Sequence, residues 1–395
     1  MKSNYRMIGD LVERIDIRNT DGTVQDLIGV SIDKCFIKSV ANTIGTNLKK
    51  YKVISKDEFA VSLMQVSRDA KIPIACLQEY DKAIISPAYS IFKIKDRDII
   101  LPEYLDLWFK RSEFDREAAF IAVGGVRGSM PWEEFCRIKV FVPDIEKQYE
   151  IVNRYKVITD RIALKQKIND NLEATAQTIF NSLFINYNKA GESEFDEFEF
   201  GKYPSDWKLV HLGAVVDIRD GTHDSPISTP VGKHLVTSRH LLPYGLDRRG
   251  AYFISDEDYA KANERSKVEY GDILFSMIGT IGTISYVTDK EVDFAIKNVG
   301  LFRTSQNPTM RYYVLTYLKS KIVTNYISSY MAGSTQSYVS LSVLRTIPFI
   351  LPPDDVVRYF ENLVTPIFSE LIENTQEISK LNDLKEVFTA AILHR

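Results

Sequence analysis

A glycine-rich loop and a scattered set of acids and histidines are the parts of this chain that could carry out chemistry. The loop, Gly279-Thr280-Ile281-Gly282-Thr283, lacks the third glycine of a dinucleotide fingerprint and the Gly-Lys-Ser/Thr ending of a phosphate-binding loop. Two glycines at this spacing between apolar runs are instead typical of a bulge or tight turn between strands. We therefore predict a structural turn at residues 279–283.

The histidines show no metal-ligand pattern. None of them forms a pair on one helix face, and two lie six apart in a predicted strand and turn, so we interpret all five as ordinary domain residues. They are His211, His223, His234, His240 and His394.

One acidic cluster contains the letters of a metal-dependent nuclease motif, but in adjacent positions. Pro143-Asp144 is followed directly by Glu146-Lys147, whereas a nuclease site needs acids from different strands. The cluster predicts a helix start, with Asp144 as the cap and Glu146 in the first turn beside the positive end of the helix dipole. The chain also has no Asn-Pro-Pro-Tyr type tetrapeptide and no Phe-x-Gly-x-Gly loop. We expect a non-catalytic protein without a bound metal or cofactor.

The composition is that of a folded protein of the cytoplasm. The three cysteines, Cys35, Cys76 and Cys136, are far apart in the sequence, which predicts buried thiols in a reducing compartment. The sequence has neither a signal-peptide pattern nor an apolar run that could span a membrane. The net charge is −3, but the acid is concentrated at residues 191–200 and in the last helical region. The two candidate domains are mildly basic, which permits DNA binding without demonstrating it.

The second half of the chain repeats the first at a constant offset of 209 positions. Gly124 aligns with Gly333, Pro143 with Pro352, and Ile158 with Ile367. In each copy a polar loop is followed by an apolar strand, a proline and a long amphipathic helix. A period of this length indicates two similar domains, each with its own core.

These elements predict an α+β fold with two similar domains, each strand-rich with helical inserts. A pseudo-two-fold axis is expected to relate the two domains. Short β-branched and aromatic runs separated by turns fill both candidate domains. A long antiparallel two-helix coiled coil is expected to separate them. The predicted ranges are 1–145 for domain 1, 146–187 for its spacer helix, 188–202 for an acidic linker, 203–353 for domain 2 and 354–395 for the second spacer helix.

The two spacer helices carry apolar residues three and four apart, which is a coiled-coil stripe. Lys165 and Asn374 occupy the same seam position at the repeat offset, and polar seam positions often fix register. We interpret Pro366 as the first residue of the second helix proper, behind a Thr365 cap. The predicted interface comprises Ile151, Tyr155, Ile158, Ile162, Leu172, Ile179, Leu183, Phe360, Val364, Ile367, Leu371, Ile378, Leu381 and Phe388.

Taken together, these features resemble the specificity subunit, HsdS, of type I restriction-modification systems, over nearly the whole chain. The strongest passages are Tyr270 to Ser276 with Gly279 and Gly282, Trp207 to Gly213, and the two closing segments that start at Ile138 and Ile347. The first domain departs from the pattern, since Lys56-Asp57-Glu58-Phe59 stands where the second has Gly271-Asp272-Ile273-Leu274. In the closing segments, Gln148 aligns at the repeat offset with the apolar Val357, which weakens that motif in the second copy.

The resemblance implies a non-catalytic subunit whose two domains each read one half of an asymmetric bipartite DNA site. It further implies docking of two modification subunits, which methylate adenine at N6, and of a restriction subunit that translocates and cleaves DNA. S-adenosylmethionine, ATP and Mg²⁺ are expected on those partners and not on this chain. A methylation-only or phage-defence complex is an alternative setting for the same subunit.

Candidate DNA contacts follow from chemistry, because base edges need short polar or guanidinium donors on loops and phosphates need Lys, Arg and hydroxyl groups. In the first domain they are Arg18, Ser31, Lys34, Gln65, Ser67, Arg68, Ser86, Arg127 and Ser129. In the second domain they are Arg219, Thr222, His223, Thr237, Ser238, Arg239, Ser276, Thr280, Lys297, Asn298 and Gln336.

Two other classes of function fit part of the sequence. Two similar domains on a coiled coil could form a scaffold that binds proteins, and an enzyme such as a nuclease could use chemistry that its motifs do not reveal. Binding to duplex DNA that weakens steeply with salt would separate the DNA-binding class from the scaffold. Turnover of DNA by the chain alone would identify the enzyme.

Overall fold

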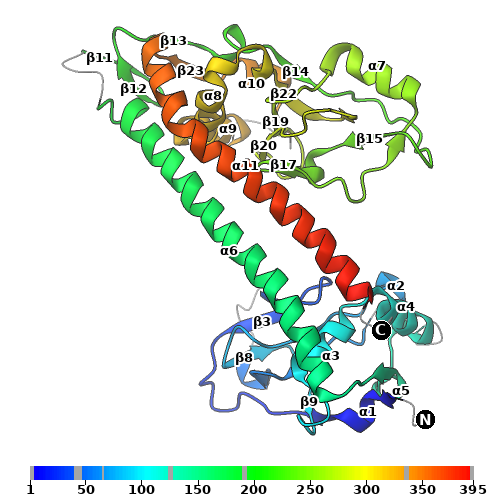
Figure 1. Cartoon of the computed structure of the whole chain (residues 1–395). Coiled ribbons are helices and arrows are strands. Elements are labelled where there is room, and N and C mark those ends of the chain that lie inside the picture. The colour runs from blue at the N-terminus through cyan, green and yellow to red at the C-terminus, as the bar shows by residue number, and fades with distance from the viewer. Residues whose placement is uncertain are drawn as a thin grey trace. The chain divides into compact units, whose positions relative to one another are not determined.

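The computed structural model of the chain (Figure 1) describes residues 4–39, 47–64, 66–122, 128–188, 194–332 and 338–391. Its contacts divide it into two compact units. The first unit contains residues 1–162 and 381–395, and the second contains residues 163–380. Both long helices therefore contribute to both units. These units cut across the predicted domain ranges, which stay a proposal.

The first unit is built on two four-stranded sheets. One has the strand order β2-β9-β6-β7, the other β4-β3-β8-β5, and β1 pairs with β10. The strands are β1 (Tyr5–Met7), β2 (Val12–Ile15), β3 (Leu27–Val30), β4 (Phe36–Lys38), β5 (Lys52–Ser55), β6 (Phe59–Val61), β7 (Ile74–Cys76), β8 (Lys82–Ile85), β9 (Ser90–Ile94) and β10 (Lys139–Phe141). The helices are α1 (Ile8–Leu11), α2 (Val66–Asp69), α3 (Pro102–Phe109), α4 (Ser112–Ala122) and α5 (Trp132–Arg137), with α6 (Ile145–Phe184) entering from this unit.

The second unit contains a four-stranded sheet β14-β22-β19-β20, a three-stranded sheet β18-β15-β21, and the pairs β13-β23, β16-β17 and β11-β12. Its strands are β11 (Phe195–Phe198), β12 (Gly201–Pro204), β13 (Lys208–His211), β14 (Ile218–Asp220), β15 (Lys233–Val236), β16 (Leu241–Leu242), β17 (Gly245–Leu246), β18 (Phe253–Ile254), β19 (Ile273–Ser276), β20 (Ile284–Tyr286), β21 (Phe294–Ile296), β22 (Val299–Phe302) and β23 (Pro348–Leu351). Its helices are α7 (Asp256–Ser266), α8 (Arg311–Leu318), α9 (Lys321–Ala332), α10 (Leu341–Arg345) and most of α11 (Asp354–Ala391).

The internal repeat extends to the topology of the sheets. The order β14-β22-β19-β20 corresponds strand for strand to β2-β9-β6-β7, and a parallel pair follows in each unit, β15 with β21 and β3 with β8. Helices α3 and α8 both have eight residues and begin 209 positions apart. The α+β fold and the repeat that the sequence predicts are therefore present in the structure.

The structure shifts our alignment of the first domain by one residue. Asp57 and Gly271 both have positive φ angles, 65° and 87°, and each donates its backbone N–H to the strand that follows, at Leu77 and Val287. The next residues match too, because the carboxylates of Glu58 and Asp272 each accept from the backbone N–H three residues earlier, at 2.8 Å. Asp57 therefore corresponds to Gly271, since a short polar side chain tolerates the left-handed region that glycine prefers.

Aromatic side chains fill the cores of both units. In the first unit, Phe59 stacks on Phe92, with a centroid distance of 5.0 Å, and both contact Phe109 edge-on. In the second unit, Tyr313 packs between Phe184 of α6 and Phe349 of β23. Burial of side chains of this size is the main stabilising contribution to each unit.

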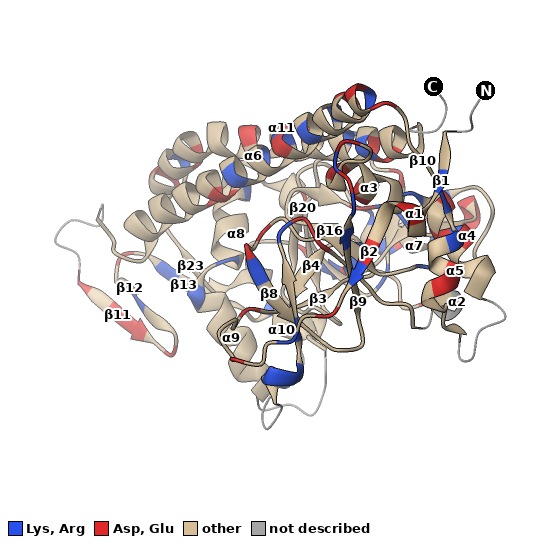
Figure 2. Cartoon of the chain, turned by 90° about the horizontal axis from the view of Figure 1, so that it is seen from below, with Lys and Arg blue, Asp and Glu red and all other residues tan. Residues whose placement is uncertain are grey.

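Helices α6 and α11 pair in antiparallel fashion (Figure 1). In the second unit, Lys165 contacts Asn374, while further along α6 Phe180 contacts Phe360 nearer the start of α11. In the first unit, Tyr155 packs against Phe388. Basic and acidic residues both occur along the two helices (Figure 2). This is the antiparallel helix pair that the sequence predicts.

The predicted seam residues differ in their burial. Ile158, Ile162, Leu183, Phe360, Val364 and Leu371 are buried, and the other predicted seam residues, Ile151, Tyr155, Leu172, Ile179, Ile367, Ile378, Leu381 and Phe388, are partly buried. The seam pattern missed Phe180, Phe184 and Phe368, all of which are buried. They belong to a second apolar stripe by which the helices pack on the second unit itself, so the apolar face is wider than a coiled-coil seam.

The interpretation of Pro366 as a helix start is wrong. Helix α11 is continuous from Asp354 to Ala391 and contains Pro366 in its interior. The hydroxyl of Thr365 donates to the carbonyl of Glu361 within the helix, instead of capping a new one. Val364 and Phe368, on either side of the proline, are both buried. Their packing offsets the cost of an interior proline, which no cap signal in the sequence reveals.

The acidic segment 188–202 is not simply a linker, which corrects our prediction. Strands β11 and β12 form an antiparallel hairpin in which Phe195 pairs with Pro204 and Phe198 with Gly201. Tyr187 packs on Phe195 with a centroid distance of 5.3 Å, and Phe200 packs on Tyr326 at 5.7 Å. Phenylalanines stand among the acidic residues of this segment. They form the contacts of the hairpin, and the high acid content obscured this signal in the sequence.

The expectation of buried thiols holds for only part of the set. Cys76 is buried and Cys136 is partly buried, whereas Cys35 is exposed in the turn after β3.

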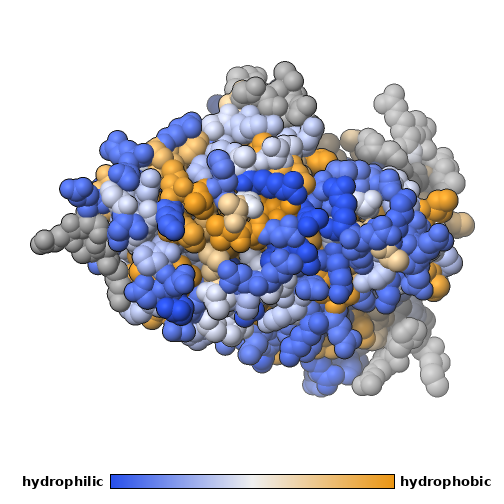
Figure 3. Space-filling model, turned by 90° about the horizontal axis from the view of Figure 1, so that it is seen from above, coloured by the Kyte–Doolittle hydropathy of each residue, from blue (hydrophilic) through white to orange (hydrophobic). Residues whose placement is uncertain are grey.

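Within the described ranges, every helix is too short or too polar to span a bilayer. The face of the molecule in Figure 3 is mainly hydrophilic, with a hydrophobic area near its centre and further hydrophobic side chains at its rim.

Candidate nucleic-acid interface

Four loops of the second unit leave its sheets at a common edge. Strand β14 ends where Asp220 pairs with Gly300, and β19 ends where Ser276 pairs with Val299. The parallel strands β15 and β21 end together at Val236 and Ile296. We call the segments that follow, residues 221–225, 237–240, 277–283 and 297–298, the loop edge. The strand ends therefore bring together polar residues that are far apart in the sequence.

Backbone hydrogen bonds lock two of these segments together. The N–H of Thr222 donates to the carbonyl of Ile296 at 3.0 Å, and the N–H of Asn298 donates back to the carbonyl of Thr222 at 3.2 Å. Gly221 makes this approach possible, because a Cβ atom there would lie 2.4 Å from the Ile296 carbonyl oxygen. Asn298 has a φ of 54°, which a short polar side chain tolerates.

His223 lies at the centre of the loop edge, with its side chain about two-thirds exposed (64%). Its Nδ1 is 2.7 Å from Oδ1 of Asn298, and its Nε2 is 3.0 Å from Oδ2 of Asp220. The buried Asp220 also accepts from Arg265 of α7. The imidazole is therefore held on both sides, by Asn298 and Asp220, and Asp220 is itself held by Arg265.

Two cations of the loop edge have no acidic partner. Lys297 donates to the hydroxyl of Ser225, and Arg239 donates to Nε2 of His240 at 3.1 Å and to the carbonyl of Gly250 at 3.3 Å. Among the described residues, neither has a carboxylate within 4.0 Å. Arg219 differs, because it is paired with Asp217 at 2.8 Å. Cations without acidic partners beside a rigid polar turn suit a polyanion.

Other predicted residues of the second unit have varied positions. Thr280 is exposed, and Thr237 and Ser238 are partly buried at the start of a short 3-10 turn. Ser276 is fully buried; its hydroxyl donates to the carbonyl of Thr280 and accepts from the N–H of Thr283 at 2.8 Å, so it shapes the loop and leaves our set of DNA contacts. Gln336 lies outside the described residues.

The glycine-rich segment is the turn that the sequence predicts. Residues 277–283 join the antiparallel strands β19 and β20, and Gly279 and Gly282 have φ angles of 78° and 90°. The N–H of Gly282 donates to the carbonyl of Ser276 at 3.1 Å. The two glycines therefore serve the backbone path of a tight connection.

The corresponding edge of the first unit is described only in part. Ser31 and Ser86 follow the ends of the parallel strands β3 and β8, and Arg18 is held by Asp16 and by the carbonyl of Lys50. Ser129 is partly buried just before α5. Gln65 and Arg127 lie outside the described residues, and of Ser67 and Arg68 only the α2 backbone is described.

Lys34 leaves the set of candidate DNA contacts. Its side chain is 5% exposed, and its ammonium lies 2.8 Å from Oδ1 of Asp115 and donates to the carbonyl of Phe109. Burial lowers the pKa of this amine. Lys34 therefore ties the turn after β3 to α4, and nothing in the sequence around it signals that its partner is 81 positions away.

Sequence reasoning missed three polar residues that hold the loop edge in place, Asp220, Ser225 and Arg265. Asp220 and Arg265 are far apart in the sequence and meet because α7 packs on β21 and β14. The signal for α7 was present, since Ser255 caps the helix by accepting from the N–H of Asp258. No pattern in the sequence indicates the ion pair between Asp220 and Arg265, because this pair depends on how α7 packs against the strands.

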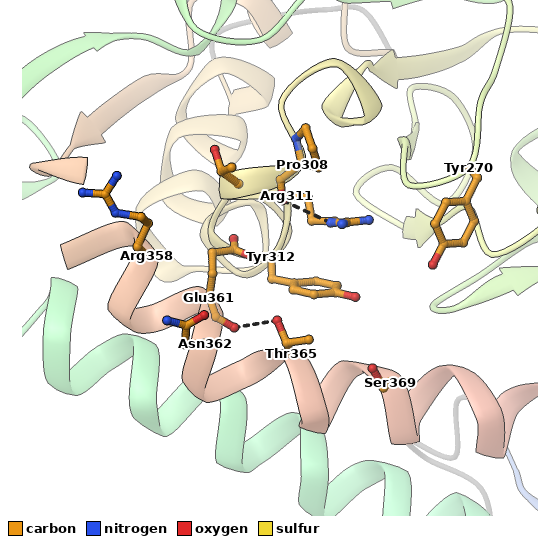
Figure 4. Close-up of a pocket in the computed structure, with 10 residues that line it drawn as sticks. Tyr270, Pro308, Arg311, Tyr312, Arg358, Glu361, Asn362, Thr365 and Ser369 are labelled. Carbon is orange, nitrogen blue, oxygen red and sulfur yellow. Dashed lines mark hydrogen bonds between the residues drawn. The ribbon is translucent and has the colours of Figure 1, made fainter. Parts of the chain in front are cut away.

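A polar pocket of about 500 Å³ lies where α8 meets α11 (Figure 4). Arg311 is oriented by Pro308 and Tyr286, whose carbonyl and hydroxyl accept from it at 3.2 and 3.3 Å. At the base of the pocket, Glu361 of α11 accepts from the N–H of Tyr313 at 2.8 Å. Burial raises the pKa of Glu361 to about 7.

The first unit joins its long helix to its domain by a different residue. Gln148 of α6 is fully buried; it accepts from the N–H of Leu101 at 3.0 Å and donates to the carbonyls of Ile99 and Pro143. Its counterpart at the repeat offset is the apolar Val357, and Glu361 takes over the polar contact one turn later. Each long helix thus supplies one buried polar side chain to the start of α3 or α8. The pocket in Figure 4 belongs to this junction in the second unit.

Comparisons with known proteins agree with the fold. Residues 204–387 match the family model of the type I restriction modification DNA specificity domain. The chain is 24% identical, over 73% of its length and 68% of the relative, to the type I restriction enzyme MjaIX specificity subunit of Methanocaldococcus jannaschii. It is 20% identical, over 80% of its length and 82% of the relative, to the HindI specificity subunit of Haemophilus influenzae.

A solved structure has the same fold. The crystal structure of the type I restriction-modification system S subunit from M. genitalium superposes with a TM-score of 0.54, at 12% identity, and the match covers 98% of this chain and 94% of that one. Residues 204–387 thus match a type I restriction modification DNA specificity domain, and the chain as a whole is similar to type I restriction enzyme specificity subunits.

Proposed function

We propose that this chain supplies DNA sequence specificity to a type I restriction-modification complex, with each unit reading one half of an asymmetric bipartite site. The observation that carries the proposal is the loop edge, where Lys297 and Arg239, without acidic partners, flank the rigid turn of Thr222, His223 and Asn298. The same strand ends recur in the first unit with different residues, which suits two unlike half-sites.

The chemistry of the loop edge divides into two tasks. Lys297 and Arg239 suit phosphate oxygens, which position the protein without reading sequence. Thr222 and Asn298 offer hydroxyl and amide groups, which can bond to base edges in the major groove, and His223 orients the Asn298 side chain. A well-aligned side chain of this kind discriminates against the wrong base by about 1–3 kcal/mol. Preorganisation by Asp220 and by the backbone reduces the entropy that these groups lose on binding.

The chain itself is proposed to be non-catalytic. The support for this proposal is the similarity to type I restriction enzyme specificity subunits. Two modification subunits would dock on this chain and contribute S-adenosylmethionine, and a restriction subunit would contribute ATP and Mg²⁺. The mixed charges along α6 and α11 (Figure 2) suit such docking.

The decisive experiment maps N6-methyladenine in DNA from cells that carry this chain with its modification subunit. We expect methylation at an asymmetric split motif that disappears when this chain is deleted. Replacement of residues 203–353 by the corresponding domain of a relative should change only one half of the motif. Methylation that persists without the chain, or a swap that leaves the motif unchanged, would contradict the proposal.

A further inference from the structure

A large apolar side chain is exposed at the same structural position in each unit, at the loop edge of the second unit and at the corresponding edge of the first. Met64 and Ile278 are 55% and 44% exposed, whereas the residues before them point inward, Met277 being 5% exposed. Each lies just beyond the end of an inner strand, β6 or β19. Isolated exposed apolar residues are common on protein surfaces, so exposure alone carries little weight.

Hydrogen bonds show that the two positions are equivalent. The N–H of Ser62 donates to Pro73 at 2.9 Å, as that of Ser276 does to Thr283. The carbonyls of the next residues, Leu63 and Met277, accept from residues that are 209 positions apart, Met130 and Val339, also at 2.9 Å in both units. Met64 and Ile278 follow directly, so the same backbone framework presents both side chains.

The position adjoins the part of the loop edge that is proposed to contact DNA. Ser276, two residues before Ile278, pairs with Val299, the residue after Asn298. In the first unit, Val61 pairs with Ser90 at the start of β9 in the same manner. Ile278 also bridges to Tyr338, which is 40% exposed. An apolar side chain is therefore held beside polar groups that suit base edges and phosphates.

The residues that follow this position differ completely between the units. Met64 is followed by Gln65-Val66-Ser67-Arg68, and Ile278 by Gly279-Thr280-Ile281-Gly282. A side chain that reads one base, for example through a thymine methyl group, should diverge with the sequence being read. An apolar side chain kept in both units instead suits a contact that is independent of sequence, such as the face of a base, which every base offers.

We infer that Met64 and Ile278 are wedge residues that insert between stacked base pairs, one in each half of the DNA site. The inference rests on the proposed function and deepens it. Isoleucine and methionine are among the side chains that unstack base steps in this way. Enzymes that modify a base must first extrude it from the duplex, at a cost of a few kcal/mol. A wedge would lower that cost for the subunit that carries out the methylation.

The test uses the full chain in complex with its modification subunits and duplexes that contain the mapped site. The adenine analogue 2-aminopurine, which fluoresces when it is unstacked, is placed in turn at each position of both half-sites. Wild-type protein should raise the fluorescence at one step in each half. Ile278→Ala should abolish the rise in the half read by the second unit and weaken binding by about 10-fold, whereas Met64→Ala should act only in the other half.

Matched variants separate the wedge from loss of fold. Ile278→Leu should retain the fluorescence rise, because it keeps an apolar side chain of the same volume. Val231→Ala removes a side chain that is 77% exposed and lies before β15, at the end opposite to the loop edge, so it should have no effect.

Two results would overturn the wedge. The first is that both alanine variants raise the fluorescence as much as the wild-type protein does. The second is that Ile278→Ala keeps the fluorescence rise but loses its preference at a single base pair. In either case the complex still selects its site, so the proposed function survives. Failure of the proposed function looks different, because the wild-type complex would then bind no split site.

Discussion

Lys165 and Asn374 meet in the seam between α6 and α11, where the lysine ammonium donates to Oδ1 of Asn374 at 2.6 Å. They are 209 residues apart, which is the offset of the internal repeat, so each is the counterpart of the other. When two equivalent helices pair in antiparallel fashion, equivalent positions meet only where a local two-fold axis crosses the pair. Lys165 and Asn374 mark that axis.

This contact can define the register of the helix pair. Asn374 is fully buried, and its amide nitrogen donates to Oδ1 of Asn169 at 2.9 Å. Lys165 also lies 3.1 Å from a carboxylate oxygen of Glu377. A slip of one helical turn would leave a buried amide and a partly buried ammonium without partners. An unsatisfied buried polar group costs about 1–3 kcal/mol, so the polar contact disfavours other registers.

Loss of the lysine should destabilise the protein measurably. Lys165→Ala leaves the carbonyl oxygen of Asn374 without its donor, and we expect the free energy of unfolding to fall by about 1–3 kcal/mol. Chemical denaturation followed by circular dichroism measures this change. Gln166→Ala, at the neighbouring exposed position of α6, should change it by less than about 0.5 kcal/mol. Equal stability of the two variants would show that the contact does not hold the helix pair.

How much the sequence could predict depends on whether a feature is local. Periodicity along α6 and α11 predicts both helices and the pairing seam, because apolar spacing is a property of each helix. The turn with Gly279 and Gly282 is predictable for the same reason, since it requires only its own backbone geometry. The burial of Lys34 and the continuity of α11 through Pro366 depend on packing partners elsewhere in the chain, so local rules gave the wrong answer.

The sequence predicts the kind of site, a cluster of polar loop residues, but only some of the residues that form it. Parallel and antiparallel strand ends bring Thr222, His223, Lys297 and Asn298 together, and all four were among the predicted residues. Ser276 has the chemistry of a contact residue but is buried, which residue type alone cannot reveal.

Glu361 should make the stability of the protein depend on pH. Burial raises the pKa of this carboxyl to about 7 from the ordinary value of 4.5, so the folded state binds the proton more tightly than the unfolded state does. Its contribution to stability is therefore most favourable below pH 4.5 and declines as the pH rises towards about 7. The total change is about 3 kcal/mol.

The variant Glu361→Gln isolates this effect. The amide oxygen can still accept from Tyr313 but does not ionise, so the stability of the variant relative to wild type should rise between pH 5 and pH 8. Urea denaturation at those two pH values measures the difference. Glu373→Gln, at an exposed position on α11, is the control and should show no such trend. A pH dependence shared by wild type and Glu361→Gln would assign it to other groups.

The two cations without acidic partners should govern how DNA binding responds to salt. Each phosphate contact contributes about one unit to the slope of the logarithm of affinity against that of salt concentration. The double variant Lys297→Ala/Arg239→Ala should therefore reduce the slope by about 2 and weaken binding to all sequences alike. Fluorescence anisotropy over a salt series measures both. Lys290→Ala, before β21 and away from the loop edge, should leave the slope unchanged, and an unchanged slope in the double variant would exclude these phosphate contacts.

Gly221 should be intolerant of any side chain. The Cβ atom of Gly221→Ala would lie 2.4 Å from the carbonyl oxygen of Ile296 and 2.9 Å from the backbone nitrogen of Lys297, so one segment must move. We expect a stability loss of about 1–3 kcal/mol, typical of overpacking. In addition, methylation should be lost at the site whose half is read by the second unit, because displacement of residues 297–298 breaks the contact between Asn298 and His223.

A matched glycine distinguishes this effect from a general cost of alanine. In Gly29→Ala the new Cβ atom would meet only the hydroxyl of Tyr89 at 3.8 Å, an ordinary contact, so stability and methylation should stay close to those of wild type. Thermal unfolding and mapping of N6-methyladenine provide the two measurements. If Gly221→Ala is destabilised but methylates its site normally, the turn of Thr222, His223 and Asn298 does not read DNA, and recognition must reside in other loops of the second unit.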